Sequence, residues 1–369
     1  MDEIALEHES PGRPNKYRKI FEQLRQAIAS GKYKEGQRIP SETQLSRTCG
    51  ASRLTVARAV KELETLGLIE RRPGSGSYVS QLPRSQGRMF GLLIPELGQT
   101  EIFEPICQGM ARASRTTKDE LVWGAASHEV ESPEQQALQL SEYYISKDVS
   151  GVFFAPLEYT ANHAAVNRRI IEDFQKTRIP VVLLDRDVCP YPYRSHCDLV
   201  GIDNRRAGFL VTEHLFRRGC ERVVFFGWPN SAATVDHRIA GYREAARRAG
   251  KPDLVEIGDA ESRESIAKLL LKHRPDGFVC ANDRTAGQIM VRLNELGVEI
   301  PGKIKITGID DAKYASFLHV PLTTVRQPCH DIGTAAIWTM IERIEYPNMP
   351  ARDVLLDCQL IVRRSCGST

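Results

Sequence analysis

The sequence predicts an α/β protein in two parts, a small N-terminal winged helix-turn-helix domain and a larger, two-lobed, doubly wound α/β domain. Residues 41–67 contain two short helical patterns separated by a tight turn, and a glycine-rich hairpin pattern follows them. From residue 89 onward, short apolar strand patterns alternate with helical patterns, which is typical of parallel sheets covered by helices. The 369 residues are enough for both parts.

The helix-turn-helix is predicted from its caps and its apolar periodicity. Ser41 is the expected N-cap of a first helix ending near Thr48, and Gly50 follows where a left-handed C-cap residue is needed. Ser52 opens a second helix. Its apolar residues recur at steps of three and four, at Val56, Ala59, Val60, Leu63 and Leu66. The opposite face is predicted to carry Arg53, Thr55, Arg58 and Lys61.

A wing is predicted directly after the second helix. Residues 68–79 have the pattern of a strand, a turn and a strand, in which Gly74 and Gly76 permit positive φ and Arg71 and Arg72 flank the turn. A basic helix followed by a short hairpin suits a DNA groove. On its own the helical pair also fits a solvated amphipathic hairpin. The Gly-Ser-Gly turn also fits a phosphate-binding loop, although no helix follows it.

The charge of the chain is unevenly distributed. Residues 13–85 contain 15 Lys and Arg against 6 Asp and Glu, whereas residues 86–369 contain 35 against 37. Positive charge concentrated in one small domain is typical of a protein that binds a polyanion. We therefore expect the first domain to bind duplex DNA and the larger domain to bind something else.

Residues 16–80 resemble the winged helix of the GntR-type regulators. The resemblance is carried by residues 36–42, 51–56 and 66–69. This chain has Ala57 where many GntR-type helices have arginine, so the usual base contact at that position is absent. The basic face, the wing and the resemblance together imply a DNA-binding set: Arg38, Ser41, Thr43, Ser52, Arg53, Leu54, Thr55, Arg58, Lys61, Arg71, Arg72, Gly74, Ser75 and Gly76.

Residues 89–369 resemble the LacI-type effector domain, which is itself similar to periplasmic sugar-binding proteins. The matching segments are residues 151–156, 179–182, 200–204, 214–219, 238–242, 280–283, 308–311 and 321–325. A GntR-type winged helix joined to a LacI-type domain is the arrangement of the arabinose repressors, and the whole chain resembles that group. The resemblance implies dimerisation through the larger domain.

An effector site is expected beyond the carboxyl ends of the strands, where ligands of such folds bind. The resemblance places Asp185, Arg238, Asn282 and Asp310 in that site, and their carboxylate, amide and guanidinium groups suit vicinal hydroxyls. Aromatic side chains that could stack on a sugar ring are Phe103, Trp228 and Phe317. Packing is the alternative for Trp228. For Asp203 and Asp283, the alternative to contact with the ligand is capping of the helix that follows.

The domain boundaries follow from composition. Residues 1–14 are predicted to be disordered, residues 15–80 to form the winged helix-turn-helix, residues 81–88 to be a polar linker, and residues 89–369 to form the ligand-binding and dimerisation domain. No run of eighteen apolar residues exists and the N-terminus is polar, so we expect neither a signal peptide nor a membrane anchor.

The cysteines indicate the compartment. Nine cysteines without paired spacing favour a reducing, bacterial cytoplasm, with the protein on the nucleoid when it is bound to DNA. Cys189, His196 and Cys197 lack a fourth ligand at useful spacing, so no metal site is expected. No cofactor is expected either.

These observations favour a homodimeric transcriptional regulator, a repressor whose operator affinity is controlled by a small carbohydrate. The alternative is an activator or corepressor-dependent regulator that senses a non-sugar metabolite such as a purine or nucleoside. An enzyme is disfavoured, because aminotransferase-like domains fused to such winged helices need a Schiff-base lysine and a longer second domain. A transport receptor would need a secretion signal and no DNA-binding domain.

Overall fold

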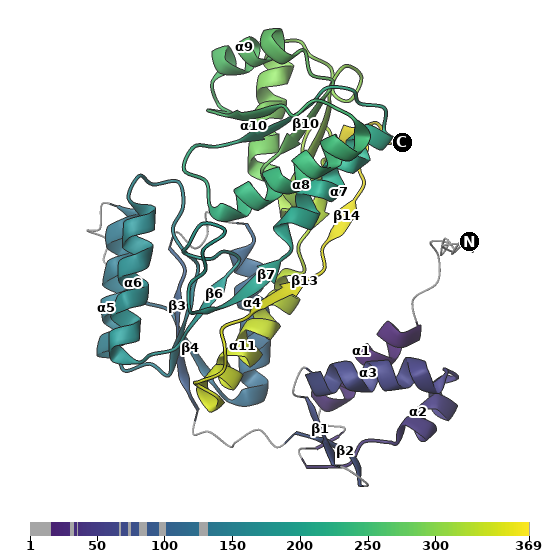
Figure 1. Cartoon of the computed structure of the whole chain (residues 1–369), viewed down its shortest axis with the longest axis vertical. Coiled ribbons are helices and arrows are strands. Elements are labelled where there is room, and N and C mark those ends of the chain that lie inside the picture. The colour runs from purple at the N-terminus through teal and green to yellow at the C-terminus, as the bar shows by residue number, and fades with distance from the viewer. Residues whose placement is uncertain are drawn as a thin grey trace, which may run out of the picture. The chain divides into compact units, whose positions relative to one another are not determined.

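A computed structural model of the chain describes residues 16–29, 33–34, 36–65, 68–72, 75–80, 87–95, 101–124 and 132–368. The chain divides into two compact units, Met1–Gln86 and Gly87–Thr369 (Figure 1). The segment predicted to be disordered, residues 1–14, and residues 81–86 of the predicted linker lie outside the described residues.

The first unit contains three helices and a hairpin among its described residues. These are α1 (Lys16–Ala29), α2 (Glu42–Cys49), α3 (Arg53–Thr65), β1 (Ile69–Arg72) and β2 (Gly76–Val79). Ser41 caps α2, and its side chain and that of Gln44 each accept a hydrogen bond from the other's backbone N–H. Gly50 ends α2 at a φ of 57°. Both predicted caps of this helix are therefore confirmed.

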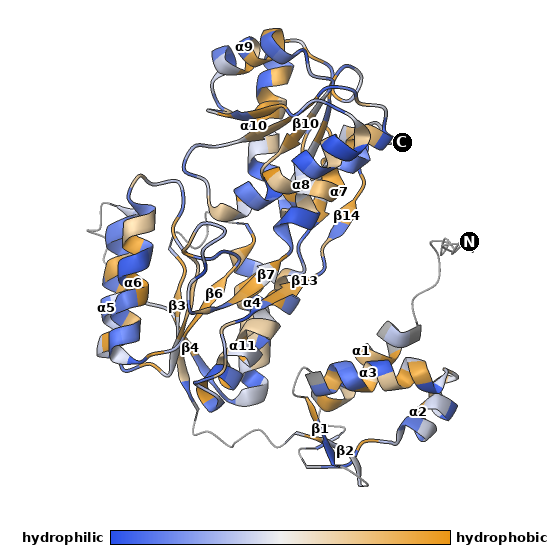
Figure 2. Cartoon of the chain, in the orientation of Figure 1, coloured by the Kyte–Doolittle hydropathy of each residue, from blue (hydrophilic) through white to orange (hydrophobic). Residues whose placement is uncertain are grey.

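The core of the first unit joins all of these elements. Its apolar side chains come from the predicted periodic positions of α3 and from the inward positions of the other elements (Figure 2). Fully or almost fully buried members are Ile20, Leu24, Ile39, Leu45, Val56, Ala59, Val60, Leu63, Ile69 and Val79. β1 and β2 pair antiparallel, from Ile69 opposite Val79 to Arg72 opposite Gly76. The helix-turn-helix is thus fixed to its wing by one small core.

The second unit has two lobes, each built on a six-stranded sheet. Lobe 1 has the strand order β13-β7-β6-β5-β3-β4, and lobe 2 has the order β14-β12-β11-β10-β8-β9. The lobe 1 strands are β3 (Met89–Leu93), β4 (Glu120–Val122), β5 (Gly151–Phe154), β6 (Val181–Leu184), β7 (Asp198–Ile202) and β13 (Asp353–Leu356). The lobe 2 strands are β8 (Val223–Gly227), β9 (Val255–Ile257), β10 (Gly277–Cys280), β11 (Lys305–Asp310), β12 (Thr323–Arg326) and β14 (Gln359–Ile361). The two orders are equivalent, as in other doubly wound folds.

Helices cover both faces of each sheet (Figure 1). In lobe 1, α4 (Phe103–Thr117) packs with α11 (Cys329–Glu345) on one face, and α5 (Pro133–Ser146) packs with α6 (His163–Thr177) on the other. In lobe 2, the corresponding pairs are α7 (Asn204–Arg217) with α8 (Ala233–Ala249), and α9 (Arg263–His273) with α10 (Asp283–Glu295). Lobe 2 also contains two short 3-10 helices, η1 (Lys313–Ser316) and η2 (Arg364–Cys366).

The chain passes between the lobes three times. The passages lie between β7 and α7, between β12 and α11, and between β13 and β14. Figure 1 shows the last passage as the yellow segment that runs from β13 to β14. Segments of this kind are where two lobes can hinge, since the backbone there belongs to neither sheet.

Two glycines bring α7 and α8 into close contact. A Cβ on Gly208 would lie 2.1 Å from the carbonyl oxygen of Arg238, and one on Gly241 would lie 1.9 Å from that of Arg205. Any larger residue would therefore separate the two helices. This packing fixes the position of Arg238 along α8.

The structure differs from the prediction at three strands. β12, β13 and β14 were not among the predicted strands, and β14 pairs antiparallel with β12 in a sheet expected to be parallel throughout. β13 and β14 are short edge strands whose apolar residues are only partly buried, and β12 buries two threonines, Thr323 and Thr324.

Among the described residues, no helix has the length and apolar character needed to cross a membrane.

Candidate functional site

The start of α3 presents two different groups of side chains. Arg53 is exposed and its Nη2 donates to Thr43 Oγ1 on α2 at 2.6 Å. Ser52 Oγ accepts from the backbone N–H of Thr55 at 3.2 Å and lies 2.8 Å from Thr55 Oγ1, so these two residues cap the helix. Leu54 is 85% exposed. Arg53 and Leu54 are therefore the accessible side chains at this end.

The basic residues predicted for one face of α3 point in different directions. Arg58 lies with its guanidinium carbon 4.8 Å from the centre of the Tyr17 ring on α1. Lys61 is paired with Glu64 at 3.1 Å. Arg53 and Arg58 are about 140° apart around the helix axis, with Arg53 beside α2 and Arg58 beside α1. The predicted face is thus divided between the two flanks of the helix.

The two wing arginines are held by acidic or aromatic neighbours. Arg71 forms ion pairs with Glu42 at the start of α2 and, at 3.8 Å, with Glu64 on α3. Arg72 lies 3.6 Å from Glu70 and 4.6 Å from the Tyr78 ring centre. Arg71 therefore connects the wing to the helix-turn-helix, a role that the sequence did not indicate.

Arg38 lies against the wing turn. Gly76 has a φ of 119°, and a Cβ on it would lie 2.6 Å from Arg38 Nε. Ser75 Oγ is 2.6 Å from the Tyr78 hydroxyl, which orients the turn. Gly74, the other predicted wing glycine, lies outside the described residues. The exposed Arg38 side chain therefore lies next to Gly76 of the wing.

Three of the predicted effector residues lie at the carboxyl ends of strands, in both lobes. Asp185 follows β6 in lobe 1, and Asn282 and Asp310 lie at the ends of β10 and β11 in lobe 2. Asp185 and Asp310 have positive φ, 69° and 130°, which is rare for residues other than glycine. Such strained backbone is concentrated at functional sites.

Arg238 on α8 and Asp310 at the end of β11 lie close together within lobe 2. The buried guanidinium of Arg238 donates through Nε to Asn204 Oδ1 at 2.8 Å and through Nη1 to the Ala281 carbonyl oxygen at 2.6 Å. Its Nη2 lies 3.7 Å from Asp310 Oδ1. Burial raises the pKa of Asp310 well above its ordinary value, although Arg238 opposes this.

In lobe 1, Asp185 belongs to a buried ion-pair network that was not predicted from the sequence. Arg186 Nε donates to Asp185 Oδ2 at 3.0 Å, and its Nη1 pairs with Glu158. The same guanidinium lies 5.6 Å from the Phe103 ring centre, which covers one of its faces. The position of Arg186 directly after a strand-end aspartate was the available signal. Its partner Glu158 is distant in sequence.

Two buried oxygen atoms of this region are left with unused acceptor capacity. Within the described part of the chain, neither Asp185 Oδ1 nor Gln327 Oε1 has a hydrogen-bond partner. Gln327 lies at the passage from β12 to α11, and its Nε2 donates to Asp310 Oδ1 at 2.8 Å. A buried acceptor without a donor is costly, so these atoms mark where a ligand would donate. We call Glu158, Asp185, Arg186, Arg238, Asp310 and Gln327 the inter-lobe cluster.

The residues Glu158 and Tyr159 connect lobe 1 to lobe 2 beside this cluster. Glu158 Oε2 accepts from the backbone N–H of Ala232 at 3.3 Å, and the Tyr159 N–H donates to the Asn230 carbonyl oxygen at 2.8 Å. Asn282 Nδ2 donates to the Tyr159 hydroxyl at 3.3 Å. The inter-lobe cluster is therefore linked to both lobes by direct hydrogen bonds.

Other predicted residues have structural roles. Asn282 caps α10, since its Oδ1 accepts from Thr285 N–H at 2.9 Å, and Asp203 caps α7. Trp228 packs on the lobe 2 core and donates to Gln288 Oε1 at 3.2 Å. Phe317 is 87% exposed after η1, so it is not proposed as a sugar contact.

Asp283, for which helix capping was the alternative, is not a cap. It is fully buried and accepts from Thr324 Oγ1 at 2.6 Å and from Ala312 N–H at 2.9 Å. Burial raises its pKa to about 7. This carboxyl group joins α10 to β12 and to the segment after β11.

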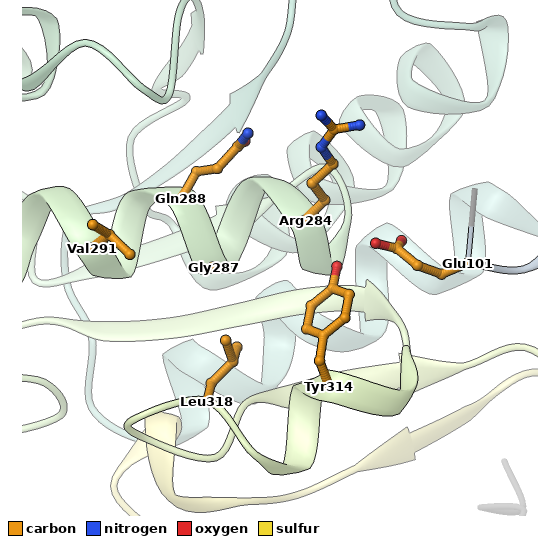
Figure 3. Close-up of a pocket in the computed structure, with 7 residues that line it drawn as sticks. All are labelled: Glu101, Arg284, Gly287, Gln288, Val291, Tyr314 and Leu318. Atoms are coloured by element: carbon orange, nitrogen blue, oxygen red, sulfur yellow. The ribbon is translucent and has the colours of Figure 1, made fainter. Parts of the chain in front are cut away.

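An open cavity of about 520 Å³ lies on α10, and none of the predicted effector residues lines it. Its lining is Glu101, Arg284, Gly287, Gln288, Val291, Tyr314 and Leu318. Figure 3 shows the Tyr314 hydroxyl pointing towards the space between Arg284 and Glu101. In the described ranges, no group of three or more His, Cys, Asp or Glu side chains is placed to hold a metal ion.

Comparisons with known proteins identify both parts of the chain. Residues 16–79 match the sequence model of the GntR family of bacterial regulatory proteins, and residues 212–366 match that of a periplasmic binding protein-like domain. The arabinose metabolism transcriptional repressor of Geobacillus stearothermophilus is 27% identical over 365 residues, which cover 95% of this chain and 97% of the relative. The ribose operon repressor of Escherichia coli strain K12 is 27% identical over 317 residues, covering 84% and 92%. Both relatives are regulators rather than enzymes.

Solved structures agree on the fold. A LacI family transcriptional regulator from Enterococcus faecium with bound ribose has a TM-score of 0.61 at 21% identity, covering 75% of this chain and 98% of that chain. The predicted fold class and both predicted resemblances are therefore confirmed. The chain joins a GntR-type helix-turn-helix domain to a periplasmic-binding-protein-like domain with the fold of the LacI-type regulators.

Proposed function

We propose that this protein is a cytoplasmic transcriptional repressor whose operator affinity falls when a small sugar binds between the lobes of its larger domain. The observation that carries the proposal is the inter-lobe cluster, in which arginine–carboxylate pairs from lobe 1 and lobe 2 lie at strand ends. Carboxylate, amide and guanidinium groups together match the alternating donors and acceptors of vicinal hydroxyls. The repressor relatives of sugar operons support the same function.

For DNA, we propose that α3 enters the major groove with Arg53 and Leu54 foremost and that the wing with Arg38 contacts the backbone. Both side chains at the start of α3 are exposed, as a groove-reading helix requires. A single small module of this kind gives modest selectivity. The protein therefore acts as a homodimer on two half-sites, with the larger domains in contact.

For switching, we propose that the sugar favours the closed arrangement of the two lobes. A ligand shifts an equilibrium only by its differential affinity for the two states, and contacts from both lobes provide such a difference. Asp185 lies in lobe 1 and Arg238 in lobe 2, so only the closed form places both beside one ligand. A coupling of about 1–3 kcal/mol between sugar and operator is the usual size for such a device.

The test is operator affinity with and without a panel of pentoses and hexoses, for the wild type, Asp185→Asn and Asp310→Asn. We expect one sugar to weaken wild-type binding about 5- to 150-fold and both variants to bind operator normally without responding. Arg247→Ala, on the exposed side of α8, is the matched control and should respond like the wild type. Retained response in both variants would place the effector elsewhere, and release by a purine or nucleoside would replace the sugar by that class.

The homodimer is tested separately by sedimentation of the full chain at micromolar concentration. We expect a dimer without DNA. A monomer under these conditions would mean that the two copies meet only on the operator.

A further inference from the structure

We infer that Leu54 reads thymine at one position of each operator half-site, through the methyl group that this base carries in the major groove. This rests on the proposed function, because it assigns a base contact to the helix that we place in the groove. The exposure of Leu54, its direction on α3 and the small size of its neighbour Ala57 support this assignment.

Leu54 differs from the other apolar residues of the first unit. Its side chain is 85% exposed, and among the described side chains of this unit it is the one large apolar side chain that is exposed. Others outside the centre of the core, such as Tyr17, Ile28 and Leu68, still pack against it. A leucine side chain contributes to stability only when it is removed from water. The apolar surface of Leu54 is therefore available to a partner.

Leu54 points directly away from the core of the first unit. It lies about 170° around the helix axis from the centre of the buried face of α3, at about 100° per residue. Arg53 lies about 100° to one side of it and Arg58 about 40° to the other. Arg53 is bonded to Thr43 on α2, and Arg58 lies over the Tyr17 ring on α1. Leu54 is therefore the central side chain of the face that a groove-reading helix turns towards the bases.

Ala57, almost one turn further along α3, leaves Leu54 uncovered. In a helix, a side chain leans over the turn on the N-terminal side of its own Cα. A long side chain at position 57 would therefore lie towards Leu54 and compete with it for a base, whereas the methyl group of Ala57 is too short to do so. The face of α3 around Leu54 is thus apolar, and the guanidinium groups of Arg53 and Arg58 lie on its two sides.

Thymine is the base whose major-groove edge suits an apolar side chain. It carries a C5 methyl group there, whereas the other three bases present hydrogen-bonding groups without a methyl group. The leucine side chain has no polar atom, so it cannot replace the water that a polar base edge loses on contact. Against the thymine methyl group, both apolar groups leave water and neither loses a hydrogen bond. Leu54 should therefore favour thymine over the other bases, and 5-methylcytosine over cytosine for the same reason.

The experiment uses a duplex that the full-length protein selects from random-sequence DNA. Each thymine is replaced in turn, in both half-sites, by deoxyuridine, which lacks only the methyl group, and affinity is measured by fluorescence anisotropy at fixed salt. We expect one position to be sensitive, with a loss of about fourfold per half-site, the effect of one methyl group. At this position, Leu54→Ala should bind the thymine and deoxyuridine duplexes alike. Leu271→Ala, which truncates an exposed leucine on α9 in the other unit, is the matched control and should discriminate like the wild type.

Salt dependence separates this contact from those of the arginines. A leucine releases no counterion, so the slope of log affinity against log salt should be the same for the thymine and deoxyuridine duplexes and unchanged in Leu54→Ala. When the sensitive base pair is replaced by cytosine and guanine, methylation of that cytosine at C5 should recover about fourfold in wild-type affinity per half-site. The same methylation should have no effect in Leu54→Ala.

The outcomes separate this inference from the proposed function. Wild-type affinity that is unchanged by every deoxyuridine replacement would overturn the inference, and so would a Leu54→Ala variant that still distinguishes thymine from deoxyuridine at the sensitive position. Both results would leave the proposed function in place. Loss of the methyl effect in Leu54→Ala, on a duplex that no sugar releases, would keep the inference and overturn the proposed control by a sugar. Failure to select any sequence would overturn both.

Discussion

The DNA-binding unit and the inter-lobe cluster both depend on arginine, but they hold it in opposite ways. Arg53 and Arg38 are exposed, and Arg53 is held by one hydrogen bond to Thr43. Arg186 and Arg238 are buried, and each has several charged or hydrogen-bonded partners. The first pair is ready to exchange its partner for a phosphate or a base, whereas the second pair is fixed before any ligand arrives.

This difference implies different energetics. An exposed arginine that meets a phosphate contributes through counterion release, so its effect depends on salt and adds to that of its neighbours. A buried ion pair contributes little net stability, but removing one partner leaves an uncompensated charge and is strongly destabilising. Substitutions in the two regions should therefore have effects of different size. Those in the DNA-binding unit should change operator affinity and its salt dependence, whereas those in the inter-lobe cluster should change the free energy of unfolding.

The largest effect is expected for Arg238→Ala. It would remove the cation beside Asp310 and leave Asn204 Oδ1 and the Ala281 carbonyl oxygen without their donor. We expect a loss of about 3–5 kcal/mol in the free energy of unfolding, measured by urea denaturation of the full chain. Arg247→Ala on the same helix should stay within about 0.5 kcal/mol of the wild type. Equal losses of unfolding free energy in both variants would show that the buried network does not contribute more to stability than an exposed arginine does.

The second prediction concerns pH and the buried Asp283. Its folded pKa is raised to about 7, whereas the carboxyl in the unfolded chain ionises near pH 4. Between these values the folded state holds a proton that the unfolded state has lost. Its contribution to stability is therefore full below about pH 4 and is lost as the pH rises to about 7. The pKa of Asp310 is raised by burial as well, so it acts in the same direction.

Thermal unfolding of the wild type and Asp283→Asn at pH 5, 6, 7 and 8 measures this pH dependence of stability. The wild type should lose stability from pH 5 to pH 7, and Asp283→Asn should lose less over the same interval. Asparagine keeps one oxygen that can accept from the Ala312 N–H, and its NH2 group can donate to Thr324 Oγ1. It does not titrate, so the slope of stability with pH is the quantity to compare. Identical slopes would place the titrating group elsewhere.

For the DNA-binding unit, Arg53→Ala should weaken operator binding by about 1–3 kcal/mol and relax the preference at one base per half-site. The exposed guanidinium at the start of α3 is the reason, since side chains there reach base edges. Lys61→Ala should weaken all sequences alike and by less, because Lys61 is paired with Glu64. A gel-shift series over substituted operators measures both, and an unchanged base preference in Arg53→Ala would contradict the assignment.

Arg71 and Arg38, both in the DNA-binding unit, are expected to differ in how they affect operator binding. Arg71 is paired with Glu42 and Glu64, so we expect Arg71→Ala to lower operator affinity by about 1 kcal/mol or less through the position of the wing, with an unchanged salt dependence. Arg38→Ala should lower the slope of log affinity against log salt by about 1, as loss of one phosphate contact does. A reduced slope in Arg71→Ala would show that Arg71 leaves its acidic partners for DNA.

The sequence predicted what depends on local pattern. The caps at Ser41 and Gly50 and the buried face of α3 follow from residues within a few positions of each other. The strand-end positions of Asp185 and Asp310 follow from the apolar runs before them. β12 was not predicted, because Thr323 and Thr324 bury hydroxyl groups whose hydrogen-bond partners, such as Asp283, are distant in the sequence.

The parts that could not be predicted depend on contacts between distant residues. Glu158 and Arg186 are 28 positions apart in the sequence, so the strand-end position of Arg186 does not identify its partner. Arg71 and Glu42 are 29 positions apart, so a wing arginine that binds DNA and one that fixes the wing have the same local sequence. Phe317 was predicted as a stacking residue because it is aromatic, but its direction depends on η1.

An effect of similarly small size is expected for Tyr159→Phe, which would remove the hydrogen bond between the Tyr159 hydroxyl and Asn282 Nδ2. This bond joins the lobes beside the inter-lobe cluster, and the Tyr159 N–H bond to Asn230 joins them as well. A single neutral hydrogen bond contributes about 0.5–1.5 kcal/mol, so sugar dissociation should be about 2- to 12-fold faster with little change in the unfolding midpoint. Tyr193→Phe, an exposed tyrosine of the same lobe, is the control. Stopped-flow measurement of sugar release distinguishes the two, and equal release rates in both variants would show that Tyr159 does not hold the lobes together.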